Sequence, residues 1–191
     1  FKKVLFDEDM IKSNRIFSIV KLKNSTKIID SFIYNIEKKL IILTSIGRLF
    51  KFDLSNKYLN PSKKQSQGQM LINLLPTEKI VSCCKGNNNQ VIYLVSKKGK
   101  FFKLNIDEIY DAHNSKLGYL NENIQLKNDH FINIISSNQY IDIETNKNKS
   151  ARLNLNKFAT YSSKNILKAE FLNLEKDEYF ENCFRLENFI N

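Results

Sequence analysis

Residues Leu40–Leu54 read LIILTSIGRLFKFDL. The stretch begins with a continuous apolar run and ends with an alternation in which Phe50 and Phe52 lie on the opposite face from Lys51. A period of two is typical of a β-strand with one buried face. Gly47 can adopt the positive φ that a tight hairpin turn often requires. The stretch therefore predicts a β-hairpin whose second strand directs Lys51 outward.

The same pattern occurs again further along the chain. Ile92–Ile106 (IYLVSKKGKFFKLNI) aligns with it without a gap, and Ile141–Leu155 is a weaker third copy in which Asn148 replaces the turn glycine. Asn is among the non-glycine residues found most often at positive φ. Lys3–Glu8 matches Lys103–Glu108, a segment that begins within the second copy and extends just beyond it. An interval of about 50 residues indicates repeated supersecondary units such as propeller blades.

A second element recurs between the hairpins, at Leu75–Val81, Leu126–Ile132 and Leu174–Phe180. Each unit is therefore expected to hold a hairpin, a long loop and one or two further strands, which makes a four-stranded blade. The predicted fold is all-β, a pinwheel-like or propeller-like array of such blades. Strands outside the hairpins and this second element are predicted at Ile16–Leu22, Lys27–Ile33 and Met70–Leu75.

The repeat also divides the chain into parts. With 191 residues, 42% of them hydrophobic, the chain is long enough for one sizeable domain or a few repeat units. Residues 1–10 are expected to end a preceding blade, and the chain, which begins at Phe, to be a piece of a longer one. Successive units are expected at approximately 16–60, 61–110 and 111–158, with 159–191 a degenerate last unit or tail.

The net charge of +10 suggests an anionic partner, although AT-rich codon usage also raises the lysine count. Nucleic acid is favoured because cations recur at equivalent positions, just after each turn and along each second strand. Evenly spaced cations on the rim of an array suit a phosphate backbone, with an affinity that falls steeply with salt. The candidate DNA-binding residues are Lys3, Arg48, Lys51, Lys63, Lys64, Lys97, Lys98, Lys100, Lys103, Lys147, Lys149 and Arg152.

Residue types that carry catalysis or hold metals are sparse. Cys83 and Cys84 are neighbours in an expected strand and therefore point to opposite faces, and neither these nor Cys183 forms a CxxC pair. His113 and His130 are distant from them, so we expect reduced cysteines and no metal site. The chain has no P-loop, GxSxG or HExxH motif. We expect no cofactor. Apolar runs are of strand length, so no membrane span is expected either.

Four runs, Ile42–Arg48, Gln67–Gln69, Ile72–Pro76 and Glu78–Ile80, resemble the C-terminal domain of the bacterial-type DNA gyrase A protein, and Val95–Lys100 fits the same repeat. The related domain of the topoisomerase IV A protein is the close alternative. The resemblance implies a β-pinwheel with DNA bent around a basic outer rim. The family's DNA-cleaving tyrosine belongs to an N-terminal part that is missing here. The fragment is thus expected to be non-catalytic within an ATP-dependent type IIA topoisomerase.

The resemblance implies three partners: double-stranded DNA bound with little sequence preference, the rest of the A protein, and the ATPase protein of the same enzyme. The resemblance also implies that the protein is located in the bacterial cytoplasm or in the stroma of an organelle. The gyrase A family carries a glycine-rich box of the form Gln-basic-basic-Gly-Gly-basic-Gly, but Met10–Val20 contains no glycine, and Lys63–Gln69 fits an ordinary loop. Chiral wrapping is therefore less expected than binding. The alternative function is a propeller-like scaffold whose basic rim meets an acidic protein.

Overall fold

The computed structural model describes residues 1–5, 12, 16, 18–23, 26–33, 38–55, 59–112, 118–120, 124, 126–136, 140–155, 167–168 and 174–185. The described secondary structure consists of antiparallel strands and one short 3-10 helix, η1 (Ile106–Glu108). The predicted all-β fold is confirmed.

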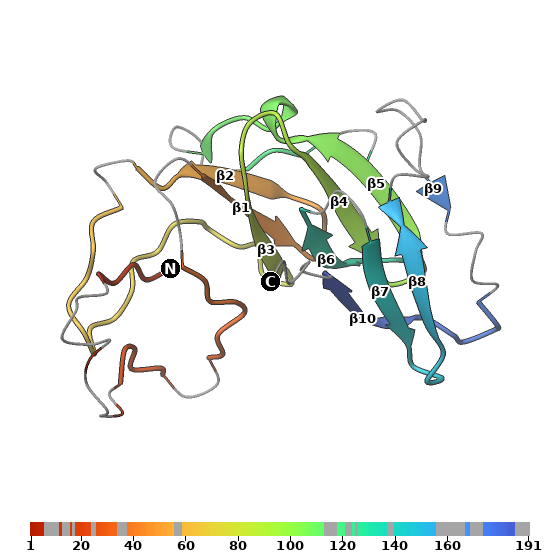
Figure 1. Ribbon diagram of the computed structural model, residues 1–191, viewed down its shortest axis with the longest axis horizontal. Coiled ribbons are helices and arrows are strands. Elements are labelled where there is room, and N and C mark those ends of the chain that lie inside the picture. The colour runs from red at the N-terminus through yellow and green to blue at the C-terminus, as the bar shows by residue number, and fades with distance from the viewer. Residues whose placement is uncertain are drawn as a thin grey trace.

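The strands form three small sheets that follow one another along the molecule (Figure 1). The first sheet has the order β2-β1-β3, with β1 at Lys39–Thr44, β2 at Leu49–Asp53 and β3 at Ile80–Gly86. The second has the order β6-β4-β5-β9, with β4 at Val91–Ser96, β5 at Lys100–Asn105, β6 at Phe131–Ile135 and β9 at Leu167–Lys168. The third has the order β10-β7-β8, with β7 at Tyr140–Thr145, β8 at Ser150–Asn154 and β10 at Phe180–Arg185.

Each sheet is built on one of the repeated hairpins. The first hairpin strand is central, and a third strand, which follows a long loop, pairs with its other edge. A fourth segment lies beside the second hairpin strand in two of the sheets. It is β9 beside β5, and for the first sheet it consists of the isolated bridges Leu49–Tyr119 and Lys51–Asp111. Both segments come from later in the chain, so neighbouring units exchange strand material.

Positive φ at the three hairpin turns confirms the turn prediction. Gly47 has φ of 92°, Gly99 of 81° and Asn148 of 58°. A Cβ on Gly47 would lie 2.7 Å from the ring of Phe131, and one on Gly99 would lie 3.2 Å from the ring of Phe180. The positive φ therefore favours glycine at both positions, and the missing side chain leaves room for an aromatic ring of the next sheet to pack on each turn.

The sheets stack face to face, so the hydrophobic core lies in layers. The first layer lies between the first and second sheets, and the second layer lies between the second and third sheets. The third layer covers the opposite face of the first sheet. Cys84 belongs to the first layer and Cys83 packs against the third, as expected for neighbours in a strand. A sheet inside such a stack has two buried faces, which explains the continuous apolar run Leu40–Leu43 in β1.

The outer face of the third sheet differs from the equivalent faces of the other two. Asp142, Glu144 and Ser150 occupy the positions that Ile41, Leu43 and Leu49 hold in the first sheet and Tyr93, Val95 and Phe101 in the second. Glu144 and Ser150 are exposed, whereas the six residues of the inner sheets are buried. A polar outer face is typical of a terminal repeat.

The strand predictions outside the hairpins are partly wrong. The described residues of Ile16–Leu22, Lys27–Ile33 and Met70–Leu75 form no strand. Although these segments are rich in apolar residues, none of their described residues pairs with a neighbouring strand, and apolar composition alone does not supply the backbone partners that a strand needs. These N-terminal segments and the loop before β3 lie beside the first sheet, away from the third (Figure 1).

Candidate nucleic-acid interface

The hairpin turns of the three sheets have the same local structure. In each, a residue of the turn donates its backbone N–H to the carbonyl of the residue before the third strand: Ser45 to Lys79 at 2.8 Å, Lys97 to His130 at 2.9 Å, and Asn146 to Tyr179 at 3.1 Å. Each hairpin turn is therefore joined to the segment that leads into the third strand. We call these regions together the turn edge; it comprises 44–48 with 75–79, 96–100 with 126–130, and 145–149 with 175–179.

The turn edge runs across the sheets because hydrogen bonds also join successive turns. Phe131, at the start of β6, donates its N–H to the carbonyl of Ser45 at 3.1 Å. Phe180, at the start of β10, donates to the carbonyl of Lys97 at 2.9 Å. The ammonium of Lys97 lies 3.8 Å from the centre of the Tyr179 ring, across the same junction. Cations carried by successive turns are thus brought to one side of the molecule.

Arg48 was predicted to face outward, and this is wrong. Its side chain is buried and forms an ion pair with Glu78, whose side chain is fully buried. Arg48 Nε donates to Glu78 Oε1 at 2.7 Å, and its terminal nitrogen also donates to the carbonyl of Asn73 at 2.8 Å. Burial would raise the pKa of Glu78, but hydrogen bonds from Arg48, from the N–H of Leu75 and from Thr44 hold it below the usual value. Arg48 therefore anchors the turn and does not reach a ligand.

Lys51 was also predicted to lie on the outer rim, and this too is wrong. Only 6% of the residue is exposed, because its side chain enters the layer between the first and second sheets. Its ammonium donates to the carbonyl of Ile106 at 3.3 Å and lies 3.7 Å from the Asp111 carboxylate. A period of two cannot distinguish a solvated face from one that a second sheet covers.

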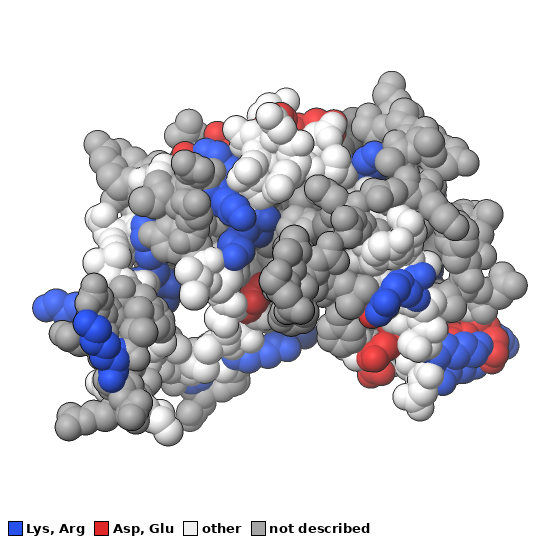
Figure 2. Space-filling view, in the orientation of Figure 1, with Lys and Arg blue, Asp and Glu red and all other residues white. Residues whose placement is uncertain are grey.

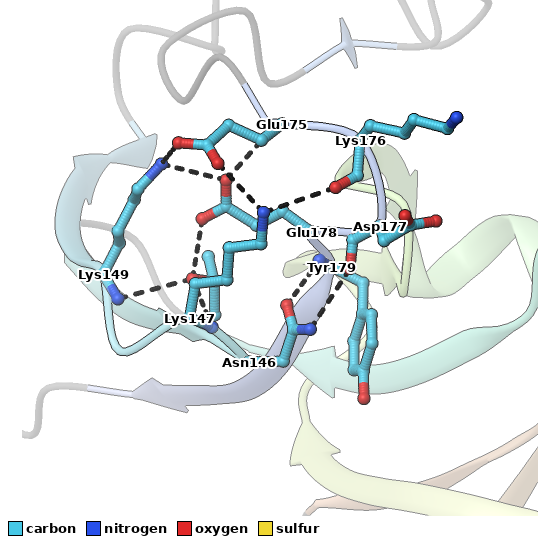
Figure 3. Close-up of polar contacts among 9 residues, drawn as sticks. Asn146, Lys147, Lys149, Glu175, Lys176, Asp177, Glu178 and Tyr179 are labelled. Atoms are coloured by element: carbon cyan, nitrogen blue, oxygen red, sulfur yellow. Dashed lines mark hydrogen bonds and ion pairs between the residues drawn. The ribbon is translucent and has the colours of Figure 1, made fainter.

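Lys147 and Lys149 are exposed, as expected, but both are paired with carboxylates (Figure 3). Lys147 Nζ lies 2.9 Å from Glu175 Oε2, and Lys149 Nζ lies 2.7 Å from Glu175 Oε1 and 3.0 Å from Glu178 Oε2. Hydrogen bonds from Lys149 and then Lys147 lower the pKa of Glu175 to about 2, and Glu175 and Glu178 raise the pKa of Lys149. This turn has local charge balance despite its lysines.

Arg152 is exposed on the outer face of the third sheet and is paired across the strands. Its guanidinium donates to both carboxylate oxygens of Asp142, at 2.8 and 3.0 Å. This lowers the pKa of Asp142 and raises that of Arg152. Lys3 is half-buried and donates to the carbonyl of Leu54 at 3.2 Å. These two cations are therefore held by the protein itself.

The remaining predicted residues divide by location. Lys97 and Lys100 are half-buried and Lys98 is exposed, all on the turn edge of the second sheet. Lys103 is half-buried on β5. The exposed Lys63 and Lys64 lie in the loop that contacts the N-terminal segment, since Gln65 donates its N–H to the carbonyl of Ile19 at 3.1 Å. The structure brings Lys97, Lys98 and Lys100 together and places Lys63 and Lys64 elsewhere.

The turn edge carries exposed basic residues that the sequence prediction missed, namely Lys79, Lys127, His130 and Lys176. The signal for them was the second recurrent element, because each lies within one of its copies. The element showed no link to the hairpins in the sequence, and only the hydrogen bonds between turn and third strand reveal that link.

The visible charge is unevenly distributed (Figure 2). Basic side chains predominate over the first sheet and the N-terminal segments, whereas acidic and basic side chains lie side by side near the β7–β8 turn. Among the described residues, no group of three or more His, Cys, Asp or Glu side chains could hold a metal ion. No helix in the same part of the chain is long and apolar enough to span a membrane.

Comparison with known proteins identifies what this array of sheets is similar to. Residues 38–83 and 90–111 match the family described as "DNA gyrase C-terminal domain, beta-propeller". The A subunit of DNA topoisomerase 4 from Synechocystis sp. (strain ATCC 27184 / PCC 6803 / Kazusa) is 27% identical over 131 residues, which cover 64% of this chain. The matched part is only 14% of that protein's length.

Solved structures show the same fold. The C-terminal domain of DNA topoisomerase IV superposes with a TM-score of 0.75 at 17% identity, covering 92% of this chain and 56% of that one. The DNA gyrase A C-terminal domain superposes with a TM-score of 0.54 at 21% identity, covering 64% of this chain and 40% of that one. The E. coli ParC C-terminal domain superposes with a TM-score of 0.55 at 12% identity, covering 77% of this chain and 56% of that one. The predicted propeller-like or pinwheel array is therefore confirmed.

Proposed function

We propose that the chain binds and bends double-stranded DNA for a type IIA topoisomerase, on the strength of its similarity to the C-terminal domains of the DNA gyrase and topoisomerase IV A proteins. The domain itself carries out no chemistry. It holds a DNA segment near the cleavage gate in the rest of the A protein and so contributes to the control of DNA topology. The proposed protein partners are the rest of the A protein and the ATPase protein of the same enzyme.

The turn edge is the observation that supports this proposal. Its exposed lysines come from all three sheets, and the hydrogen bonds between successive turns set them in a row. Contacts to phosphates position DNA without reading its sequence, and lysine serves for them as a point charge. A row of such contacts across stacked sheets suits a duplex that follows the edge. The proposed DNA-facing residues are Lys79, Lys97, Lys98, Lys100, Lys127, Lys147, Lys149 and Lys176.

The test is duplex DNA binding as a function of salt concentration. The variant Lys79→Glu/Lys98→Glu/Lys127→Glu reverses three exposed charges on the turn edge, and Lys21→Glu/Lys23→Glu/Lys27→Glu reverses three in the N-terminal segment. Lys51 is unsuitable because it is buried. Each lost phosphate contact should reduce the slope of log K against log salt by about 0.9. We expect a flatter slope and weaker binding for the first variant only.

If both triple variants lose DNA affinity equally, binding responds to net charge alone, and the turn-edge proposal is contradicted. Bending is tested by ring closure of short linear duplexes, which we expect the bound protein to accelerate. The linking number of nicked plasmid closed around the bound protein then shows whether the bend is chiral. Poly-glutamate serves as the probe for the alternative partner, an acidic protein. Binding to poly-glutamate as strong as binding to DNA would favour the scaffold function.

A further inference from the structure

The three turns of the turn edge differ in local charge. The turn of the second sheet has four lysines and one aspartate, a net charge of +3. The turn of the first sheet has Arg48 and Lys79 against Glu78, a net charge of +1. The turn of the third sheet has three lysines against three carboxylates and is neutral. The middle turn is therefore the most strongly basic of the three.

One acidic position is shared by all three turns. The backbone bonds that precede the third strands align Lys79, His130 and Tyr179, so the residues before them, Glu78, Asp129 and Glu178, are equivalent. The cation after each hairpin turn is also equivalent. Arg48, Lys100 and Lys149 donate their N–H groups to the hydroxyls of Thr44, Ser96 and Thr145, at 3.1, 3.0 and 3.4 Å. The middle turn has an aspartate where the other two have a glutamate.

The two glutamates hold the cation of their own turn, and the aspartate does not. Glu78 pairs with Arg48, and Glu178 pairs with Lys149. Asp129 Oδ1 instead accepts the backbone N–H groups of Lys98 at 3.1 Å and His130 at 2.8 Å. Its Oδ2 is buried and has no hydrogen-bond partner within the described part of the chain. In the same part of the chain, no carboxylate pairs with the Lys100 ammonium.

From this difference we propose that the middle turn is the principal phosphate-binding site, and that aspartate at position 129 leaves Lys100 available to a phosphodiester of DNA. Lys100 acts there with Lys98 and Lys97 from the same turn. A glutamate at position 129 would be one methylene longer and would hold Lys100, as its equivalents hold Arg48 and Lys149. This inference rests on the proposed function and names which part of the turn edge binds most strongly.

The experiment is the substitution Asp129→Glu, which leaves the net charge unchanged. We expect several-fold weaker binding of duplex DNA and a salt slope reduced by about 0.9, the value of one phosphate contact. Lys100→Gln should have the same effect alone and almost none when added to Asp129→Glu, because both changes remove the same contact. Asp107→Glu, an exposed position just after β5, is the matched control and should bind as the unchanged protein does.

Circular dichroism and thermal melting establish that each variant is folded. Should Asp129→Glu fail to fold, the DNA affinity of Lys100→Gln is compared with that of Lys127→Gln, a variant also on the turn edge. If Lys100→Gln loses no more affinity for duplex DNA than Lys127→Gln does, the inference is overturned. Salt-dependent binding that Asp129→Glu leaves unchanged would also overturn it, while the proposed function would stand. If the protein without substitutions shows no salt-dependent binding of duplex DNA, the proposed function and this inference are both overturned.

Discussion

Arg48 and Glu78, separated by 30 residues in the sequence, form a buried ion pair that joins the first hairpin turn to the segment before β3. The carboxylate also accepts the N–H of Leu75 at 2.9 Å, so it organises two turns at once. In the third sheet Glu178 does the same, accepting the N–H of Glu175 at 2.9 Å and a hydrogen bond from Lys149. The cations that follow the first and third turns, Arg48 and Lys149, thus help to hold the fold together.

Replacing Arg48 by Met should destabilise the protein strongly. Glu78 would remain buried without its cation, and breaking such a pair from one side typically costs about 3–5 kcal/mol. The free energy of unfolding from urea titration is the measurement. The double variant Arg48→Met/Glu78→Gln should recover part of the loss, because it removes the unpaired charge. An Arg48→Met protein as stable as the original would contradict the structural role given to this pair.

Stability should fall as the solution becomes acidic. The folded-state pKa of Glu78 is depressed, so its contribution is complete above the ordinary value of 4.5 and is lost as the pH falls through the folded value. Asp53 behaves alike, because hydrogen bonds from Lys39 and Ser55 lower its pKa from 3.8 to about 2. Urea midpoints should therefore decrease between about pH 4.5 and about pH 2. Glu78→Gln should show a smaller decrease, and an identical pH profile would exclude Glu78 as a cause.

The turn glycines should tolerate alanine unequally. At Gly47 the positive φ costs an alanine about 1–2 kcal/mol, and the new Cβ would lie 2.7 Å from the Phe131 ring. At Gly99 the nearest ring atom, on Phe180, is 3.2 Å away, so the loss should be smaller. Thermal or urea unfolding measures both losses. Adding Phe131→Leu should make Gly47→Ala less harmful than it is alone; strictly additive losses would show that the contact is unimportant.

The cysteines should react slowly in the folded protein. Burial, followed by the nearby Asp30 carboxylate, raises the pKa of Cys83 to about 12, and burial followed by Asp142 does the same for Cys183. Because the thiolate is the nucleophile, both should stay protonated and unreactive at any pH well below 12. Labelling with a chromogenic disulfide in buffer and in urea is the measurement. Labelling in buffer as fast as in urea would contradict the packing of these thiols.

Several features follow from local sequence. The repeated hairpins, the positive φ at Gly47, Gly99 and Asn148, and the all-β class all depend on a period of two and on turn chemistry. Such signals involve residues close in the chain, and a pattern in the letters suffices to read them. The family resemblance rests on the same local runs.

Tertiary structure alone decided which face of each strand meets solvent and which cations have partners. Lys51 and Arg152 occupy equivalent positions, yet Lys51 is buried between two sheets and Arg152 is exposed on the last one. Arg48 and Lys100 are likewise equivalent, but a carboxylate 30 residues away from Arg48 withdraws that cation from the surface. The chain by itself determined the repeating hairpin. The stacking of the sheets determined its exposure, because burial and ion pairing depend on neighbours that are distant in sequence.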